Sequence, residues 1–258
     1  MLKAVAFDLW ETLITDTPDV SREQERLRMS RLEEILSARG HAAVADRIER
    51  AYRALWHRCQ ELYWSVDRDV PCRRQIEHLL EELQLDAASF DDATLAELEH
   101  AYAMAAVEIP PHVVRHAPEM LDALKSRGFG IGLISNTGRT PGYALREILE
   151  RLGLARSIDV MVFSNEHGHC KPQTSIFEEL RRGLGVGYPE MMFVGDNLYV
   201  DVHGAQRCGM RGVHFQPAVR GTAIAPHFDH GLEIVPDAVV TSLDEVVPLV
   251  LAEPWQRP

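Results

Sequence analysis

The chain has 258 residues, 46% of them hydrophobic and 26% charged, which is typical of a globular protein. Its 27 lysines and arginines against 39 aspartates and glutamates give a formal charge of −12, which excludes a global attraction to nucleic acid or to an anionic membrane. No segment reaches the roughly 18 apolar residues of a membrane span, and the amino-terminal apolar stretch is not expected to be a signal peptide. The four cysteines are scattered without a C-x-x-C pair, so we expect reduced thiols in a cytoplasmic protein.

The chain begins with an apolar run, Leu2 to Phe7, which predicts a buried strand that ends at Asp8. From about residue 20 to 107 apolar residues recur at steps of three and four, which predicts several helices and no strand. Ser21 followed by Gln24 resembles a capping box at the start of the first helix, and Gly40 predicts its end. The aromatic residues of this block, among them Trp56, Tyr63 and Trp64, are expected in its core.

After Pro110 and Pro111 strands and helices alternate. The expected strands are Ile131–Ile134, Val160–Phe163, Met191–Val194, Val213–Phe215 and Ala238–Val240. The expected helices are Ala117–Arg127, 141–152, 173–183, 200–208 and Leu243–Leu251. This alternation predicts a parallel sheet that is covered by helices on both faces.

The pattern as a whole predicts an α/β fold with a Rossmann-like parallel-sheet core and an inserted all-helical cap domain. The core is expected over residues 1–15 and 112–258 and the cap over residues 16–111. By position alone, the segments Ile14–Ser21 and Glu108–His116 are the expected hinges.

Polar residues stand at or just beyond the predicted strand ends: Asp8, Ser135, Lys171 and the pair Asp196 and Asp201. Taken singly, each has an ordinary explanation as a turn residue, a helix cap or a surface charge. In an open parallel sheet, however, ligands bind at the carboxyl ends of the strands. A carboxylate can be a covalent nucleophile, a hydroxyl with loop amides can hold oxyanions, a lysine can neutralise charge, and further carboxylates can hold Mg²⁺. The set therefore suits an anionic substrate.

Four segments in chain order carry a family resemblance: FDLWETL, LISNT, GHCKPQTSIF and VGDNLYVDVHGAQRCGM. They resemble the four motifs of the haloacid dehalogenase-like (HAD) hydrolase superfamily, in the subgroup with a helical cap after the first strand. The later stretch PDAVVTSLDEV resembles the usual final strand and helix of the family. The resemblance covers nearly the whole chain and implies hydrolysis of a small anionic organic substrate.

The resemblance also implies roles for single residues. Asp8 matches the family nucleophile, which forms an aspartyl-phosphate or an aspartyl ester. Ser135 matches the phosphate-binding hydroxyl, with the backbone amide of Asn136 beside it, and Lys171 matches the charge-balancing lysine. Asp196 matches the direct ligand of Mg²⁺, and an acidic residue that supports the metal site is matched at position 201.

Two residues depart from the family pattern. Trp10 stands where family phosphatases carry the aspartate that acts as general acid and base; its backbone carbonyl can still bind Mg²⁺, but an indole N–H only donates. Loss of such a group typically costs about 10²- to 10⁴-fold in rate. Glu11, in place of the usual glycine, is the nearest other carboxylate, although neighbouring residues of an extended segment point to opposite sides. Glu11 can therefore either take the acid–base role beside the substrate or pair with a cap or hinge residue.

Three functions follow from these departures. The first is a Mg²⁺-dependent phosphatase for substrates with good leaving groups, in which Glu11, a cap histidine or the substrate itself replaces the missing acid. The second is a 2-haloacid dehalogenase, since those enzymes carry an aromatic residue at the position of Trp10, although their fourth motif differs from the metal-binding form found here. The third is a weakly active member that binds phosphate ligands. The sequence carries no signal for an oligomeric state.

Two pairs among the twelve histidines need an interpretation of their own. His167 and His169 form an HGH stretch that resembles a transition-metal ligand pair, but its place in the third-motif loop favours solvated loop histidines. His227 and His230 show no further ligand cluster, so we assign them no role.

Overall fold

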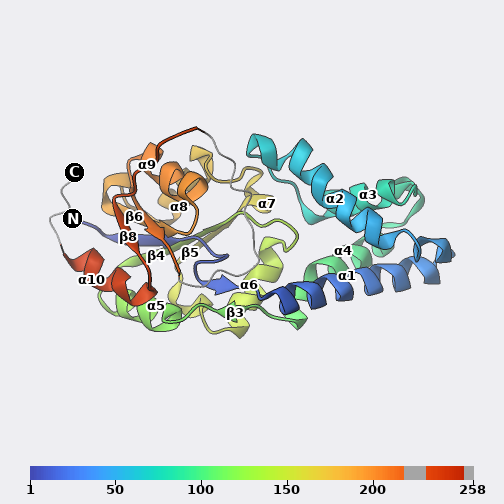
Figure 1. Ribbon diagram of the computed structural model, residues 1–258, viewed down its shortest axis with the longest axis horizontal. Coiled ribbons are helices and arrows are strands. Elements are labelled where there is room, and N and C mark those ends of the chain that lie inside the picture. The colour runs from blue at the N-terminus through green and yellow to red at the C-terminus, as the bar shows by residue number, and fades with distance from the viewer. Residues whose placement is uncertain (218–230, 253–258) are drawn as a thin grey trace.

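A computed structural model describes residues 1–217 and 231–252 and contains a six-stranded sheet (Figure 1). All neighbouring strands are parallel, and their order is β5-β4-β1-β6-β7-β8. The strands are β1 (Ala4–Phe7), β4 (Gly130–Ser135), β5 (Val160–Phe163), β6 (Met191–Gly195), β7 (Arg211–Phe215) and β8 (Ala238–Val240). The predicted α/β fold with a parallel sheet is confirmed.

Helices cover both faces of this sheet. In Figure 1, α8 and α9 lie on one face and α5 and α10 lie on the other. The alternation of side chains along β1 serves both layers: Ala4 and Ala6 belong to the apolar cluster under α8, whereas Val5 and Phe7 belong to the cluster shared with α5 and α6. The helices are α5 (Ala117–Ser126), α6 (Gly142–Arg151), α7 (Ser164–His167), α8 (Thr174–Leu184), α9 (Gly204–Cys208) and α10 (Val246–Leu251).

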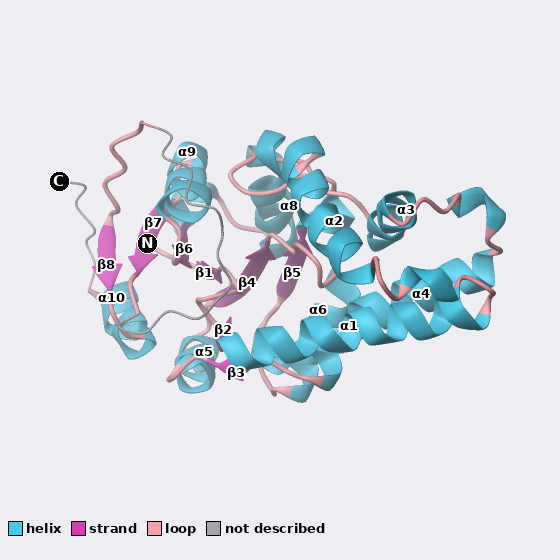
Figure 2. Cartoon of the chain, turned by 45° about the vertical axis from the view of Figure 1, so that its right-hand side comes forward, coloured by secondary structure: helices cyan, strands magenta, loops and turns pink. Residues whose placement is uncertain are grey.

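Between β1 and β4 the chain forms a helical insert beside the sheet (Figure 2). The insert consists of α1 (Pro18–Ala38), α2 (Ile48–Leu62), α3 (Cys72–Glu82) and α4 (Asp92–Glu108). Its two connections to the sheet, β2 (Ile14–Thr15) and β3 (His112–Val113), pair with each other as antiparallel strands. The insert is therefore joined to the rest of the chain at one place.

The first helix of the insert begins earlier than the sequence predicts. Its N-cap is Thr17, whose hydroxyl accepts a hydrogen bond from the backbone N–H of Val20, and Pro18 occupies the first helical position. Proline has a φ angle that suits this position, so the helix starts there and the predicted capping box at Ser21 does not form. Gly40 has a φ of +89° and follows the last turn, as the sequence predicts.

The predicted helix over 200–208 is replaced by two shorter elements. A π-helical segment covers Leu198–His203, and α9 follows directly. The side chain of Asn197 accepts hydrogen bonds from the backbone N–H groups of Tyr199 and Val200, at 2.9 and 3.1 Å, so winding begins before residue 200. This start brings Asp201 into the first turn.

None of the four cysteines forms a disulfide, as the sequence predicts. Cys59, Cys72 and Cys170 are buried, and Cys208 is half-buried. Within residues 1–217 and 231–252, no helix is long and apolar enough to cross a lipid bilayer.

Candidate active site

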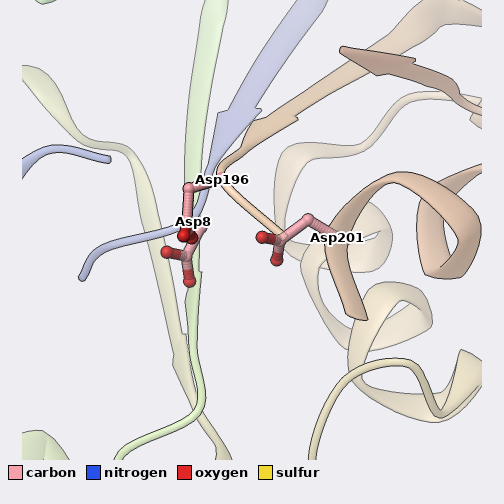
Figure 3. A group of neighbouring side chains, drawn as sticks. All are labelled: Asp8, Asp196 and Asp201. Carbon is pink, nitrogen blue, oxygen red and sulfur yellow. The ribbon is translucent and has the colours of Figure 1, made fainter. Parts of the chain in front are cut away.

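Three carboxylates meet at the carboxyl edge of the sheet. Asp8 follows β1, Asp196 follows the neighbouring strand β6, and Asp201 lies in the π-helical segment beyond it. All three residues are buried, and one oxygen of each lies within 4.8 Å of those of the other two. Figure 3 shows the Asp201 side chain directed toward Asp8 and Asp196. The structure thus brings together the three acidic residues that the sequence predicts for a metal site.

The buried cation Lys171 pairs with two of these carboxylates. The Nζ atom of Lys171 donates to Asp8 Oδ1 at 2.5 Å and to Asp201 Oδ1 at 2.6 Å, and it also donates to the carbonyl of Ile134 at 3.1 Å. The Lys171 side chain is only 1% exposed. A buried charge is tolerated only when it is paired and hydrogen-bonded, and here all three contacts serve that purpose.

The pKa values of Asp8 and Lys171 reflect their burial and their pairing. The pKa of Asp8 is raised to about 7: burial is the largest cause, Lys171 opposes it, and the charge of Asp201 adds to the rise. Burial alone would lower the pKa of Lys171, but the charges of Asp201 and Asp8 raise it to about 12. Lys171 is therefore charged at neutral pH.

The fixed position of Asp201 depends on its neighbours. The backbone N–H of Asn197 donates to Asp201 Oδ2 at 3.0 Å. A Cβ atom on Gly195 would lie only 2.4 Å from the Oδ2 and Cγ atoms of Asp201, so only glycine leaves room for this carboxylate. The local backbone thus fixes the position of the Asp201 carboxylate.

The second-motif residues lie beside the carboxylates. Ser135 ends β4, next to β1 in the sheet; it is fully buried, and its hydroxyl lies 3.5 Å from the carbonyl oxygen of Asn136. The side chain of Asn136 accepts from the Lys171 backbone N–H at 2.8 Å and donates to the Lys171 carbonyl at 3.1 Å. Asn136 therefore holds the second-motif and third-motif loops together, which leaves its backbone for a substrate.

The chain turns back after Asp8, and Glu11 lies in this turn. The backbone N–H of Glu11 donates to Ile14 at 2.7 Å, and Glu11 has a φ of +59°, in the left-handed region that favours glycine. The expectation of an extended segment is therefore wrong. The Glu11 carboxylate accepts from the hydroxyl of Thr15 at 3.0 and 3.1 Å, so Glu11 pairs with a residue of the predicted hinge.

A cavity of about 700 Å³ lies between the helical insert and the carboxyl edge of the sheet. Asp8, Trp10 and Lys171 line it from the sheet side, whereas Ser135 and Glu11 do not. The residues that line it from the insert and the hinge are Asp16, Ser21, Gln24, Glu25, Arg28, Trp56, Gln60, Trp64, Ser65 and Asp67. The cavity thus connects the carboxylate cluster with the insert.

Of the aromatic residues expected in the core of the insert, Tyr63 and Trp64 are partly buried and pack against the apolar core, whereas Trp56 and Trp64 also line the cavity. Both rings line the cavity, with their centroids 4.6 Å apart, and the guanidinium of Arg139 lies 4.7 Å from the Trp56 ring centroid. Helical spacing identifies an apolar face but not the element that this face contacts. Arg139 lies two residues after the second motif, and this position is the sequence signal that points to it.

Several hydrogen bonds dock the insert on the segments that follow β4 and β5, among them those of Asp69 and Arg28. Buried Asp69, in the loop before α3, accepts from the hydroxyl of Thr137 at 3.0 Å and from that of Ser164 at 2.5 Å. Burial raises the pKa of Asp69, and its hydrogen bonds oppose this rise. Arg28 of α1 donates to the hydroxyl of Thr140 at 3.1 Å.

Neither His167 nor His169 belongs to the carboxylate cluster. Both ring nitrogens of His167 have partners, Glu179 and Ser175, so this side chain is not simply solvated as expected. The ring of His169 lies 5.7 Å from that of His167, centroid to centroid. His227 and His230 lie outside the described residues.

Comparison with known proteins identifies relatives along nearly the whole chain. The family model of the haloacid dehalogenase-like hydrolases matches residues 2–209. Glyceraldehyde 3-phosphate phosphatase of Methanopyrus kandleri is 31% identical over 212 residues, which cover 81% of this chain and 82% of that protein. Ribulose-1,5-bisphosphate 5-phosphatase of Halopiger xanaduensis is 28% identical over 251 residues, which cover 97% of this chain and 100% of that protein.

Solved structures with the same fold include members with two different chemistries. The 2-haloacid dehalogenase of Pseudomonas syringae pv. Tomato DC3000 superposes with a TM-score of 0.67 at 24% identity, over 98% of this chain and 99% of that one. The HAD phosphatase of Thermococcus onnurineus superposes with a TM-score of 0.59 at 22% identity, over 100% of both chains. At these identities the likeness establishes the fold, and the chemistry has to be argued from the site.

Proposed function

Because the chain belongs to the haloacid dehalogenase-like hydrolases, we propose that this hydrolase is a Mg²⁺-dependent phosphatase of small phosphorylated organic compounds. The observation that carries the proposal is the cluster itself: three buried carboxylates lie together at the carboxyl edge of the sheet, and Lys171 pairs with two of them, Asp8 and Asp201. Buried carboxylate oxygens grouped in this way suit a divalent cation. The two named relatives, both phosphatases of small sugar phosphates or triose phosphates by name, support this choice.

The donor set fits Mg²⁺. It consists of carboxylate oxygens, which hard cations prefer, and contains no thiolate or imidazole. Asp8, Asp196 and the backbone carbonyl of Trp10 would hold the ion, and Asp201 would support the site. When bound, Mg²⁺ would neutralise charge on the transferring phosphoryl group.

The remaining roles belong to side chains of the chain itself. Asp8 would attack the phosphorus atom and form an aspartyl-phosphate, which water then hydrolyses. Lys171 holds Asp8 in position and offsets charge on the phosphoryl group, and Ser135 with the backbone amide of Asn136 would bind the phosphoryl oxygens. Trp10, which lines the cavity, would contact the organic part of the substrate.

We also propose that residues 16–111 act as a cap over a core of residues 1–15 and 112–258. The cavity between the two supports this division, as does the single connection through β2 and β3. Closure of the cap on Ile14–Ser21 and Glu108–His116 would exclude water from the aspartyl-phosphate.

One experiment distinguishes the proposed function from two others. The aromatic Trp10 in the cavity favours a 2-haloacid dehalogenase as second candidate, because halide leaves without a proton. Release of 4-nitrophenol from its phosphate ester and of chloride from 2-chloropropionate should be measured side by side, with Mg²⁺ and with EDTA. We expect Mg²⁺-dependent phosphate release. Metal-independent chloride release would establish a dehalogenase, and stabilisation by phosphate without turnover would establish a binding protein.

Asp8→Asn tests the nucleophile in the same assay. It should abolish phosphate release and leave the fold intact, since asparagine keeps the shape of the side chain but is a poor nucleophile. Asp122→Asn is the matched control, because Asp122 pairs with Arg156 on the surface. Undiminished turnover of Asp8→Asn would overturn the assignment.

A further inference from the structure

A phosphate monoester of an alcohol needs a proton on its leaving oxygen, and the indole of Trp10 does not supply one. The cavity has to contain another acid. Outside the carboxylate cluster, the carboxyl groups that line it within the described chain are those of Asp16, Glu25 and Asp67. No described histidine lines the cavity, and Glu11 faces Thr15 instead.

Two of these three carboxyl groups belong to the insert. Glu25 lies on α1, its side chain is 43% exposed, and it pairs with Arg139 at 3.2 Å. Asp67 lies in the turn after α2, where its backbone carbonyl accepts from the N–H of Cys170 at 2.9 Å. Both would move with the insert relative to Asp8.

Asp16 is different, because it lies on the segment that leaves Asp8, within the predicted hinge Ile14–Ser21. The chain turns back on itself after Asp8: Ile14 donates to the Leu9 carbonyl at 3.0 Å and forms a β-bridge with Trp10. Asp16 follows Ile14 by two residues, which is about 7 Å of extended chain. Asp16 is 7% exposed and lines the cavity that also contains Asp8. A short turn thus connects Asp16 with the predicted nucleophile.

We propose that Asp16 is the general acid and base of this hydrolase, in place of the carboxylate that residue 10 lacks; this inference rests on the proposed phosphatase function.

The surroundings of Asp16 suit this role. Gln24 donates to Asp16 Oδ1 at 3.3 Å, and the charged or titratable groups that act on Asp16 are Arg28, Glu11 and His112. Burial raises the pKa of Asp16 to about 6; Arg28, the Gln24 hydrogen bond and His112 lower it, and Glu11 raises it. A general acid and base works best when its pKa lies near the working pH.

The two half-reactions balance with this group. In the first, an Asp8 oxygen bonds to phosphorus, the bond from phosphorus to the leaving oxygen breaks, and that oxygen takes the proton of neutral Asp16. In the second, the Asp16 carboxylate takes a proton from water while the water oxygen bonds to phosphorus. The bond from phosphorus to Asp8 breaks, Asp8 regains its electron pair, and Asp16 is neutral again.

The test compares Asp16→Asn with wild type on two esters, sn-glycerol 1-phosphate and 4-nitrophenyl phosphate. With the alkyl ester, kcat/KM should fall about 10²- to 10⁴-fold, the typical effect of a general acid. With the aryl ester, kcat/KM should change less than about tenfold, because nitrophenolate leaves without a proton. The kcat of Asp16→Asn on the aryl ester should still fall, because hydrolysis of the aspartyl-phosphate loses its general base. Rapid mixing should therefore show a burst of nitrophenolate.

A purely structural role for Asp16 would not produce the same pattern. Wild-type kcat/KM on the alkyl ester should decline above about pH 6, as the acid loses its proton, and this limb should be absent in Asp16→Asn. Adding Trp10→Asp to Asp16→Asn should recover part of the alkyl-ester activity. Glu25→Gln, a carboxyl change in the same cavity, should alter neither the ester preference nor the pH limb.

The outcomes separate this inference from the function on which it rests. If wild type and Glu25→Gln release no phosphate from either ester, the phosphatase function itself is wrong. If wild type is active and Asp16→Asn keeps its kcat/KM, or loses equal factors on both esters without a burst, the assignment of Asp16 is wrong.

Discussion

Lys171→Met would show how strongly the buried carboxylates depend on their one ammonium group. Methionine keeps the length of the side chain but leaves Asp8 and Asp201 without their cation. Loss of one partner from a buried ion pair typically costs about 3–5 kcal/mol. For a chain of this size each kcal/mol lowers Tm by about 2–4 °C, so we expect Tm in EDTA to fall by about 6–20 °C.

The matched control is Lys3→Met. Lys3 also pairs with a carboxylate, Glu190, at 2.6 Å, but its side chain is 62% exposed. An exposed pair of this kind contributes about 0–1 kcal/mol, so this variant should unfold close to wild type. Both variants should be followed by thermal and urea unfolding in EDTA at pH 7.5.

Addition of Mg²⁺ provides the second half of this prediction. An ion that binds only the native state stabilises it by about 2.7 kcal/mol at a hundredfold excess over Kd. Mg²⁺ should therefore recover much of the stability that Lys171→Met loses and recover little for Lys3→Met. Equal stability of Lys171→Met and Lys3→Met in EDTA would refute the argument that Asp8 and Asp201 depend on Lys171.

Three further predictions concern single contacts. Gly195→Ala should weaken Mg²⁺ binding about 10- to 100-fold in calorimetric titration, since the new Cβ displaces Asp201; unchanged affinity would contradict the metal site. Asp69→Ala should lower the free energy of unfolding in urea by about 2–4 kcal/mol, because it leaves the buried hydroxyls of Thr137 and Ser164 without their acceptor; a change below about 0.5 kcal/mol would contradict this. Because burial raises the pKa of Asp16 to about 6 in the folded state, its contribution to stability is complete below about pH 4 and disappears as pH rises through 6. Asp16→Asn should therefore flatten the urea stability profile between pH 4 and 7, and an unaltered slope would argue against the burial effect.

The sequence predicted those site residues that the parallel sheet positions. Asp8, Lys171, Asp196 and Asp201 all follow or approach strand ends, and parallel strands bring their carboxyl ends to one edge whatever the details of packing. Apolar runs mark such strands without reference to any partner. The carboxylate cluster was therefore predictable before its geometry was known.

The part that the insert contributes was not predictable in the same way. Trp56 and Trp64 fit a helical core pattern, yet they line the cavity, because periodicity does not say which element an apolar face meets. Arg28 is one of many arginines in the insert, and only its contacts with Thr140 and with the carbonyl of Tyr102 distinguish it. Long-range packing decides these positions.

The conformation of the segment after Asp8 was predicted wrongly from sequence for a local reason. An extended segment would have brought Glu11 to the opposite side from Trp10, whereas the left-handed conformation of Glu11 folds the chain back instead. The same turn brings the segment with Asp16 back toward the strand end. If this stretch is taken as extended, both the position of Glu11 and the return of Asp16 toward the strand end are predicted wrongly, because the turn is left out.

Gln24→Leu would test how the insert and the proposed acid are connected. The Nε2 atom of Gln24 donates to Asp16 Oδ1 at 3.3 Å and to the carbonyl of Ile109 at 2.9 Å, so it joins the two hinge segments. A hydrogen bond to a carboxylate favours its charged form and lowers its pKa, so its loss should move the pH limb on the alkyl ester to higher pH. Since such a bond is worth about 1.5–3 kcal/mol, kcat should also fall about tenfold or more, through a less well held acid.

Gln60→Leu is the control, because Gln60 lines the same cavity from α2 and its Nε2 has no hydrogen-bond partner. If both glutamine variants shift the limb equally, the polarity of the cavity rather than the Gln24 hydrogen bond sets the pKa of Asp16. If only Gln24→Leu shifts it, the insert holds the acid in place, and the protonation chemistry of the site depends on the docking of α1.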